Sequence, residues 1–227
     1  MDSKKIIIAP SLLSCDLSNL ESECRKVLDA DADWLHLDVM DGNFVPNLTF
    51  GYPVLSSLRK KLPDAHFDVH LMITNPLKWV QNVAKTADSI SFHYEACKDI
   101  DEVIKVIKKI KFCKKKVGLA INPNTQISSV EKILEKELLD YILIMTVVPG
   151  FGGQPFNKRC LEKIKKVNLK YPNLNIQVDG GINKETFKMC LEKGANIFVS
   201  GSTIFNHSEP KLLIKDLRDS ASGIFFS

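Results

Sequence analysis

Residues 34–51, WLHLDVMDGNFVPNLTFG, decide the fold of this chain. From Trp34 to Met40 every odd-numbered residue is aliphatic, whereas the even-numbered side carries His36 and Asp38. This alternation predicts a β-strand, because successive side chains of a strand point to opposite faces. The turn-forming residues Asp41–Asn43 follow at once. An imidazole and a carboxylate therefore share one face at the carboxyl end of a strand, where parallel α/β folds place their chemistry.

The stretch HFDVHLM, from His66 to Met72, repeats this pattern. Its odd-numbered residues are apolar, and Asp68 and His70 lie on the opposite face. In a closed barrel the apolar faces of both strands can pack outward against helices, while the polar faces point inward. The two polar faces can then meet in the mouth of the barrel.

The rest of the chain continues as strand-then-helix units without a Pro-, Ser- or Gly-rich linker. The predicted strands are Ile6–Ser11, Trp34–Met40, His66–Met72, Ser89–His93, Lys116–Asn122, Tyr141–Val147, Asn175–Gly181 and Asn196–Ser202. Two of the predicted helices are located by their first residues: one is capped by Asp16 or Ser18, and one opens at Asn75 and Pro76. The other predicted helices are Pro53–Lys61, Asp99–Ile110, Ser129–Glu137, Phe156–Lys170, Lys184–Lys193 and Pro210–Arg218. Eight such units predict an α/β protein with one (β/α)8 TIM-barrel domain over residues 1–227. A doubly wound open sheet, the alternative, needs fewer units or a topological switch that the pattern does not show.

Composition and charge fit an ordinary globular domain. The chain has 44% hydrophobic and 26% charged residues, with a formal net charge of +4. Its lysines concentrate between Lys105 and Lys116, but no nucleic-acid motif accompanies them. We interpret this run as a solvated helix face with its following loop rather than as a nucleic-acid patch.

Cysteine spacing and hydropathy indicate a cytoplasmic protein. The 6 cysteines are scattered without a C-x-x-C pair, which favours reduced thiols over a disulfide framework or a zinc ribbon. The apolar run before Pro10 is too short for a signal peptide. No stretch approaches the roughly 20 apolar residues of a membrane span, so we expect no membrane partner.

Two imidazoles and two carboxylates are expected to face the barrel mouth. They are His36, Asp38, His70 and Asp179, from the second, third and seventh predicted strands. This donor set suits Zn²⁺, Fe²⁺, Mn²⁺ or Co²⁺. A single strand histidine is more often structural, but two related patterns and a D-G-G sequence favour a metal site. Asp68 lies deeper and is interpreted as a hydrogen-bond partner for a metal-binding histidine.

Glycines follow the last three predicted strands and suggest a phosphate site. Glycines let backbone N–H groups approach phosphate oxygens closely, and barrels often bind phosphate near their last strands. Each pair alone is more often a plain turn, but three at consecutive strand ends favour a phosphate cradle. The residues are Gly150, Phe151, Gly152, Gly153, Gly180, Gly181, Gly201 and Ser202.

Three methionines end inward-facing patterns on the second, third and sixth predicted strands. They are Met40, Met72 and Met145. A buried methionine usually fills a gap in the core. Three around one mouth suggest an apolar collar that excludes water from a reacting carbon.

Five motifs in chain order resemble those of the ribulose-phosphate 3-epimerase family. They are HLDVMDGNFVPNLTFG, FDVHLM, GFGGQPF, VDGGIN and VSGS, and the likeness extends from Ala9–Asp16 (APSLLSCD) to the eighth strand. The resemblance implies a barrel of the ribulose-phosphate-binding type. It also implies a metal-dependent isomerase that interconverts D-ribulose 5-phosphate and D-xylulose 5-phosphate in the pentose phosphate pathway, without an organic cofactor.

The resemblance also implies roles for individual residues. Asp38 would accept and Asp179 would donate the C3 proton through a cis-enediolate, and one divalent ion, Zn²⁺ as first choice, would lie between them. His36, His70, Asp179 and Ser11 would contact substrate, and the glycine loops would hold its phosphate. Family members form dimers or larger even assemblies, so a homo-oligomer is expected. Val148 and Asn124 depart from the family pattern, which puts the conformation of their loops in question.

Three rival functions remain open at this point. An epimerase for a six-carbon analogue such as allulose 6-phosphate would use the same residues. A phosphate-binding barrel decarboxylase would use a lysine inside the barrel, and the second and third strands carry none. A non-catalytic barrel that binds sugar phosphate or metal is disfavoured, because both candidate acid–base residues are present.

Overall fold

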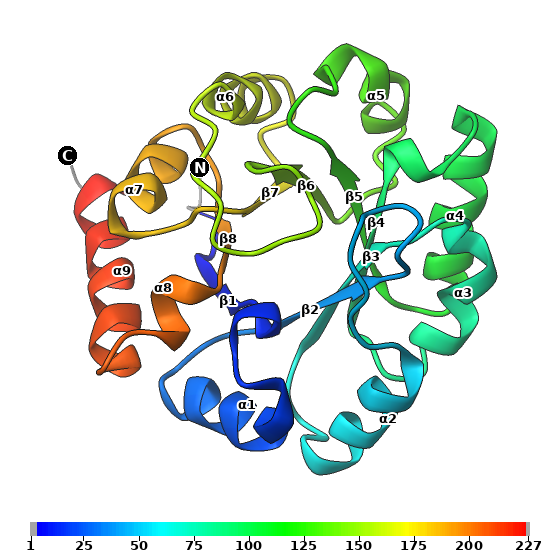
Figure 1. The fold of residues 1–227 in the computed structure, drawn as a ribbon. Coiled ribbons are helices and arrows are strands. Elements are labelled where there is room, and N and C mark those ends of the chain that lie inside the picture. The colour runs from blue at the N-terminus through cyan, green and yellow to red at the C-terminus, as the bar shows by residue number, and fades with distance from the viewer. Residues whose placement is uncertain (1–3, 226–227) are drawn as a thin grey trace.

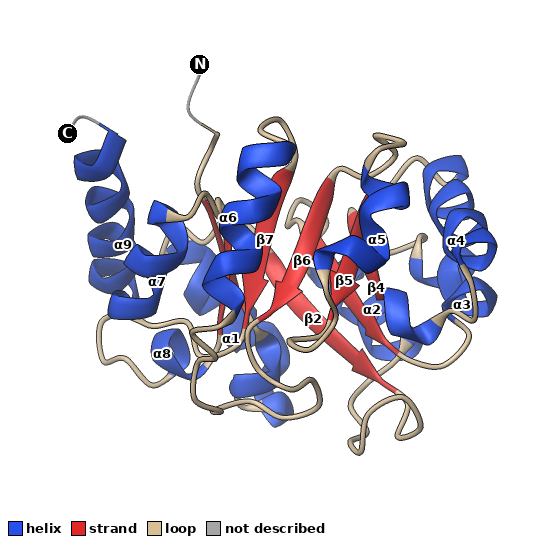
Figure 2. Cartoon of the chain, turned by 90° about the horizontal axis from the view of Figure 1, so that it is seen from above, coloured by secondary structure: helices blue, strands red, loops and turns tan. Residues whose placement is uncertain are grey.

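The computed structural model describes residues 4–225, with side chains to Ala221, and consists of a ring of parallel strands surrounded by helices (Figure 1). The strands are β1 Ile7–Pro10, β2 Leu35–Met40, β3 Phe67–Met72, β4 Ser89–His93, β5 Lys116–Ile121, β6 Tyr141–Met145, β7 Asn175–Asp179 and β8 Ile197–Ser200. Each lies within its predicted range. Figure 2 shows that the strand arrows point to one end of the barrel, where the loops after β2 and β6 lie.

Strand pairing closes the sheet into a barrel. The 8 strands pair in parallel in the order β1-β8-β7-β6-β5-β4-β3-β2. An isolated parallel bridge between Ser11 and His36 joins the remaining edges. The predicted (β/α)8 barrel is therefore confirmed, and the open-sheet alternative is wrong, because β1 pairs with the last strand of the chain. The predicted domain limits, 1–227, include five terminal residues outside the described range.

Helices alternate with the strands and cover the outside of the ring (Figure 1). They are α1 Leu20–Asp29, α2 Tyr52–Lys61, α3 Pro76–Val83, α4 Ile100–Phe112, α5 Ile127–Leu134, α6 Cys160–Lys170, α7 Lys184–Glu192, α8 Ser202–Phe205 and α9 Pro210–Phe225. Short 3-10 turns are η1 Leu12–Ser14, η2 Leu17–Asn19 and η3 Tyr94–Ala96. Within residues 4–225 no helix is both long enough and apolar enough to cross a membrane.

The predicted helices differ from the structure at several ends; α5, for example, ends at Leu134 rather than at Glu137, and α9 extends to Phe225. The carboxylate of Asp16 accepts from the Ser18 backbone N–H and so caps η2, whereas α1 begins later, at Leu20. The helix expected from Phe156 begins at Cys160, because the Asn157 N–H bonds to the Thr146 carbonyl at the end of β6. The short helix α8 was not predicted; it begins immediately after Gly201.

Apolar side chains form two layers, one outside and one inside the ring. Leu35 and Leu37 of β2 are fully buried in the outer layer with Val69 and Leu71 of β3. This confirms that the apolar faces of β2 and β3 pack outward. The inner layer includes Trp34 and the inward-facing residues of β6 and β8. The polar faces of β2 and β3 therefore point into a barrel that is filled below them.

Gly118 of β5 provides a test of the inner layer. A Cβ at this position would lie 2.3 Å from Cε2 of Tyr141, whose hydroxyl donates to Asp68 at 2.8 Å. We expect Gly118→Ala to lower the free energy of unfolding by about 1–3 kcal/mol, since overpacking forces the ring to move. Chemical denaturation measures this loss. The control, Gly51→Ala, places its Cβ no nearer than 4.0 Å to a neighbour and should cost about 1 kcal/mol or less, from the loss of glycine at the N-cap of α2 alone. Equal midpoints for both variants would contradict the expectation.

Candidate active site

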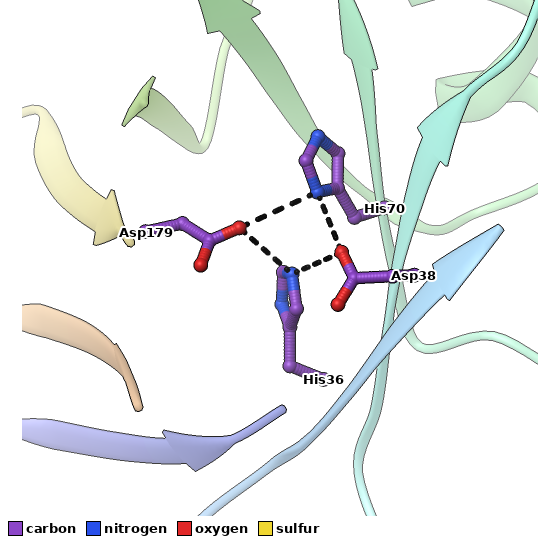
Figure 3. A group of neighbouring side chains, drawn as sticks. All are labelled: His36, Asp38, His70 and Asp179. Carbon is purple, nitrogen blue, oxygen red and sulfur yellow. Dashed lines mark hydrogen bonds and ion pairs between the residues drawn. The ribbon is translucent and has the colours of Figure 1, made fainter. Parts of the chain in front are cut away.

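Strand register brings four predicted metal ligands together. His36 pairs with Asp68 and Asp38 pairs with His70 across β2 and β3, and Asp179 ends β7. One ligand atom from each of His36, Asp38, His70 and Asp179, hereafter the His–Asp cluster, lies within 4.8 Å of the others. Figure 3 shows Asp38 and Asp179 on opposite sides of the two imidazoles.

Distances within the His–Asp cluster join each carboxylate to both imidazoles. Oδ1 of Asp38 lies 3.0 Å from His70 Nδ1 and 3.3 Å from His36 Nε2. Oδ2 of Asp179 lies 3.6 Å from each of the same two nitrogens. The two carboxylates thus face one small space between two ring nitrogens (Figure 3).

A buried carboxylate below the cluster orients His36. Nδ1 of His36 lies 2.8 Å from Oδ2 of Asp68. Asp68 also accepts hydrogen bonds from the Tyr141 hydroxyl at 2.8 Å and from Nε2 of Gln177 at 2.6 Å. Because an ionised carboxylate only accepts, the Nδ1–H of His36 donates to it and Nε2 faces the cluster. Asp68 therefore lies behind His36, as predicted.

Opposite charges inside the cluster shift the pKa values of His36 and Asp38. Burial alone lowers the pKa of His36, but the charge of Asp38 and the nearby carboxylates of Asp179 and Asp68 outweigh it, and the net pKa is raised well above 6.5. Burial likewise raises the pKa of Asp38, but His36 and His70 outweigh it and lower the net value. Without a cation, His36 is therefore protonated beside an ionised Asp38.

The His–Asp cluster fits a divalent cation. Nε2 of His36 is buried and makes no hydrogen bond to any described residue. Its neighbours are a second imidazole nitrogen and two carboxylate oxygens, a donor set typical of Zn²⁺ and other first-row metals. An unsatisfied buried nitrogen is costly, and a cation at this point would satisfy it.

Two hydroxyl groups bond to the strand ends that carry Asp38 and Asp179. Ser11 Oγ donates to Asp38 Oδ2 at 2.8 Å, while the other oxygen, Oδ1, faces His70 Nδ1. Thr146 Oγ1 lies within hydrogen-bond distance of the backbone carbonyls of Asp179 and Gly180, and the Thr146 backbone N–H donates to the Asp179 carbonyl at 2.8 Å. These bonds fix the ends of β2 and β7 from β1 and β6.

A small cavity opens above the cluster. The cavity, hereafter the mouth cavity, has a volume of about 220 Å³, small for a ligand site. Both carboxylates, Ser11, all three predicted methionines and the predicted glycine loops contribute to its lining, whereas His36 and His70 lie fully buried beneath it. The predicted residues in the lining are Ser11, Asp38, Met40, Met72, Met145, Gly150, Phe151, Gly152, Gly153, Asp179, Gly180, Gly181, Gly201 and Ser202.

Glycine is required where the chain turns after β7, beside the mouth cavity. Gly180 has a φ of +115°, and a Cβ there would lie 2.3 Å from Cγ2 of Val147. Side chains are disfavoured in this region of φ, and Val147 leaves no room for one. The chain can therefore turn directly after Asp179 and bring its backbone to the cavity.

Sequence analysis missed His93 at the end of β4. This side chain is fully buried, and its Nε2 lies 2.9 Å from Nε2 of His70. The signal was present, because Ser89, Ser91 and His93 give β4 the same polar alternation as β2 and β3.

The fold and the His–Asp cluster together place the protein in a class, the (β/α)8-barrel enzymes with a candidate metal site at the carboxyl ends of the strands. The model of the "Ribulose-phosphate 3 epimerase family" matches residues 7–205. The chain belongs to this family, as the motifs predicted.

Curated relatives match over nearly the full chain. "Ribulose-phosphate 3-epimerase, cytoplasmic isoform" of Oryza sativa subsp. japonica is 44% identical and covers 95% of this chain and 94% of the relative. "Ribulose-phosphate 3-epimerase" of Candida glabrata is 42% identical, with coverage of 95% and 92%. The Bacillus subtilis protein of the same name is 41% identical, with coverage of 95% and 99%. The predicted assignment to an epimerase family of enzymes is confirmed.

Solved structures support the fold. 3-Keto-L-gulonate-6-phosphate decarboxylase from Vibrio cholerae superposes with a TM-score of 0.74 at 16% identity, covering 97% of this chain and 98% of that chain. At this identity the likeness shows the barrel alone.

Proposed function

We propose that this protein is a metal-dependent 3-epimerase that interconverts D-ribulose 5-phosphate and D-xylulose 5-phosphate. The observation that carries the proposal is the position of Asp38 and Asp179, which reach one small cavity from β2 and β7. Inverting a carbon beside a ketone requires removal of its proton from one face and return of a proton to the other. Two carboxyl groups on opposite sides of one carbon can do both.

Asp38 is the proposed proton acceptor in the direction from ribulose 5-phosphate. Its lowered pKa keeps it ionised, and the Ser11 hydroxyl fixes the position of Oδ2. Asp179 is the proposed donor to the opposite face of C3, which resolves a cis-enediolate into product. In the reverse direction the two residues exchange roles. Each proton transfer of this kind contributes roughly 10²–10⁴-fold to the rate.

The His–Asp cluster is the proposed site for one divalent cation, with Zn²⁺ as the first candidate and Fe²⁺, Mn²⁺ or Co²⁺ as alternatives. His36, Asp38, His70 and Asp179 would hold it, and their geometry supports this role. When bound, a cation stabilises negative charge that develops on the substrate oxygens.

The mouth cavity is the proposed sugar-phosphate site. Its glycine loops, at residues 150–153, 180–181 and 201–202, can offer backbone N–H groups to phosphate oxygens. Met40, Met72 and Met145 are each 5% exposed or less and form the proposed apolar collar over the reacting carbon. Room beyond C3 of the substrate would separate a five-carbon from a six-carbon sugar, and substrate kinetics decide between them.

Assembly and location are further parts of the proposal. We propose a single domain over residues 1–227, acting in the cytoplasm as a homo-oligomer, either a dimer or a larger even assembly. The name of the rice relative, a cytoplasmic isoform, supports the location. Family resemblance supports the oligomer, and analytical ultracentrifugation tests it.

Incubation with D-ribulose 5-phosphate in D₂O tests the proposed reaction. We expect D-xylulose 5-phosphate to form with deuterium at C3, because the returned proton comes from an exchangeable carboxyl group. Unlabelled product from a single turnover would contradict the two-carboxyl mechanism. Faster turnover of allulose 6-phosphate would favour the six-carbon alternative, and no turnover of either sugar would favour a non-catalytic barrel.

A further inference from the structure

His70, a member of the His–Asp cluster, contacts a further histidine, His93, and the two rings face each other through the same atom, Nε2. Nε2 of His70 lies 2.9 Å from Nε2 of His93, and both rings are fully buried. Their centroids lie 5.0 Å apart with an interplanar angle of 21°. Only one of two facing nitrogens can carry the hydrogen of this bond. The direction of the bond therefore decides which nitrogen of His70 has a lone pair for the cluster.

Glu95 sets that direction. Its Oε2 lies 3.2 Å from Nδ1 of His93, while its Oε1 accepts from the Asn122 backbone N–H at 2.8 Å and from the Thr125 hydroxyl. Burial raises the pKa of Glu95, but its bonds to His93, Thr125 and Asn122 outweigh it, and the net pKa is lowered. Glu95 is thus an ionised carboxylate, which accepts hydrogen bonds and donates none.

The ionised Glu95 determines which nitrogens of His93 and His70 carry hydrogens. Because Glu95 accepts, Nδ1 of His93 carries a hydrogen, and Nε2 of the neutral His93 ring is an acceptor. A neutral ring fits this position, because His93 is fully buried and only its Nδ1 faces a carboxylate. His70 must then donate through Nε2, which leaves the lone pair of its Nδ1 directed at Asp38 and Asp179.

We infer that Glu95 and His93 are positioning residues that fix the tautomer of His70 so that its Nδ1 is available as a metal ligand. The inference rests on the proposed function of the His–Asp cluster. Asp68 likewise fixes the tautomer of His36, but there Nδ1 carries the hydrogen and Nε2 faces the cluster. The cluster therefore has two separate carboxylate supports, Asp68 below it and Glu95 beside it.

Neighbouring elements hold the His93–Glu95 pair in place. The ring of Phe44 packs against His93 with centroids 4.8 Å apart. Nζ of Lys163 donates to the carbonyls of Asn122 and Pro123 at 2.9 and 2.6 Å, so α6 holds the loop that binds Glu95. Phe44 and the loop held by Lys163 therefore restrict the movement of the His93 and Glu95 side chains.

Co²⁺ affinity, followed by the visible absorption of the ion, tests the inference without substrate. We expect His93→Phe to weaken Co²⁺ binding by about 10–100-fold, because Nε2–H of His70 loses its acceptor. His93→Gln, whose amide oxygen can accept that hydrogen, should recover most of the affinity. His66→Phe makes the same change at a histidine bonded to Ser89, outside the cluster, and should bind Co²⁺ like the wild type.

Imidazole ¹⁵N NMR of the Zn²⁺-loaded protein tests the protonation directly. We expect His93 to carry its hydrogen on Nδ1 in the wild type. In Glu95→Gln the amide can donate as well as accept, so the Nδ1–H form should no longer dominate. A hydrogen on Nε2 of His93 in the wild type would overturn the inference.

Separate outcomes distinguish this inference from the proposed reaction. If the wild type fails to epimerise ribulose 5-phosphate while His93→Phe alone binds Co²⁺ more weakly, the proposed reaction is wrong and the positioning role stands. If the wild type epimerises but folded His93→Phe binds Co²⁺ as tightly as wild type, the positioning role is wrong. Circular dichroism verifies that each variant is folded.

Discussion

Asp179→Asn is expected to abolish epimerisation of D-ribulose 5-phosphate while proton exchange at its C3 continues. Asp38 can still remove the proton, but no donor serves the opposite face, so the proton returns to the face it left. In D₂O the substrate should therefore gain deuterium without formation of xylulose 5-phosphate. We expect turnover to fall by at least about 10²–10⁴-fold, the contribution of one positioned acid. Mass spectrometry measures the label, and a coupled assay measures the product.

Asp38→Asn should show the mirror pattern. From ribulose 5-phosphate it should give neither exchange nor product, whereas from xylulose 5-phosphate it should give exchange alone. Both aspartates are also candidate ligands, so bound metal is quantified in each variant and rates are compared at saturating Co²⁺. Asp64→Asn, at an exposed position, is the matched control and should retain full activity. Wild-type turnover in either site variant would contradict the assignment of two acid–base residues.

The sequence was sufficient to predict the barrel and the cluster because their pattern is local. Alternation along β2 and β3 is visible within seven residues, and it shows which side chains face inward. Closure of the ring then brings Asp179 to the same point. These features depend on strand periodicity and parallel topology, both of which can be read from sequence.

Features that depend on single tertiary contacts were not predicted. The start of α6 depends on the bond from Asn157 N–H to the Thr146 carbonyl, and composition does not reveal such a bond. Likewise Asp16 could cap either η2 or α1 by its residue type alone. The role of Glu95 depends on its bonds to the loop after β5, which lies 27 residues away along the chain at Asn122.

Removal of the metal is expected to abolish turnover and to lower the melting temperature. A cation at 100 times its dissociation constant stabilises the native state by about 2.7 kcal/mol. For a chain of this length, this corresponds to a shift of roughly 5–10 °C. Calorimetry of chelated and Zn²⁺-reloaded protein measures the shift, and reloading should restore activity. Full activity in chelated protein with no detectable bound metal would contradict the prediction.

This metal stabilisation should increase with pH. In metal-free protein the raised pKa of His36 contributes stability that is fully present below its unfolded value, about 6.5, and is lost as pH rises through the folded value. The lowered pKa of Asp38 contributes stability above its unfolded value, about 4, and this is lost as pH falls through the folded value. A cation must displace the His36 proton, so it binds more tightly as pH rises. The difference in melting temperature between loaded and chelated protein should therefore widen between about pH 5.5 and about pH 8. A constant or narrowing difference would show that His36 loses no proton on metal binding.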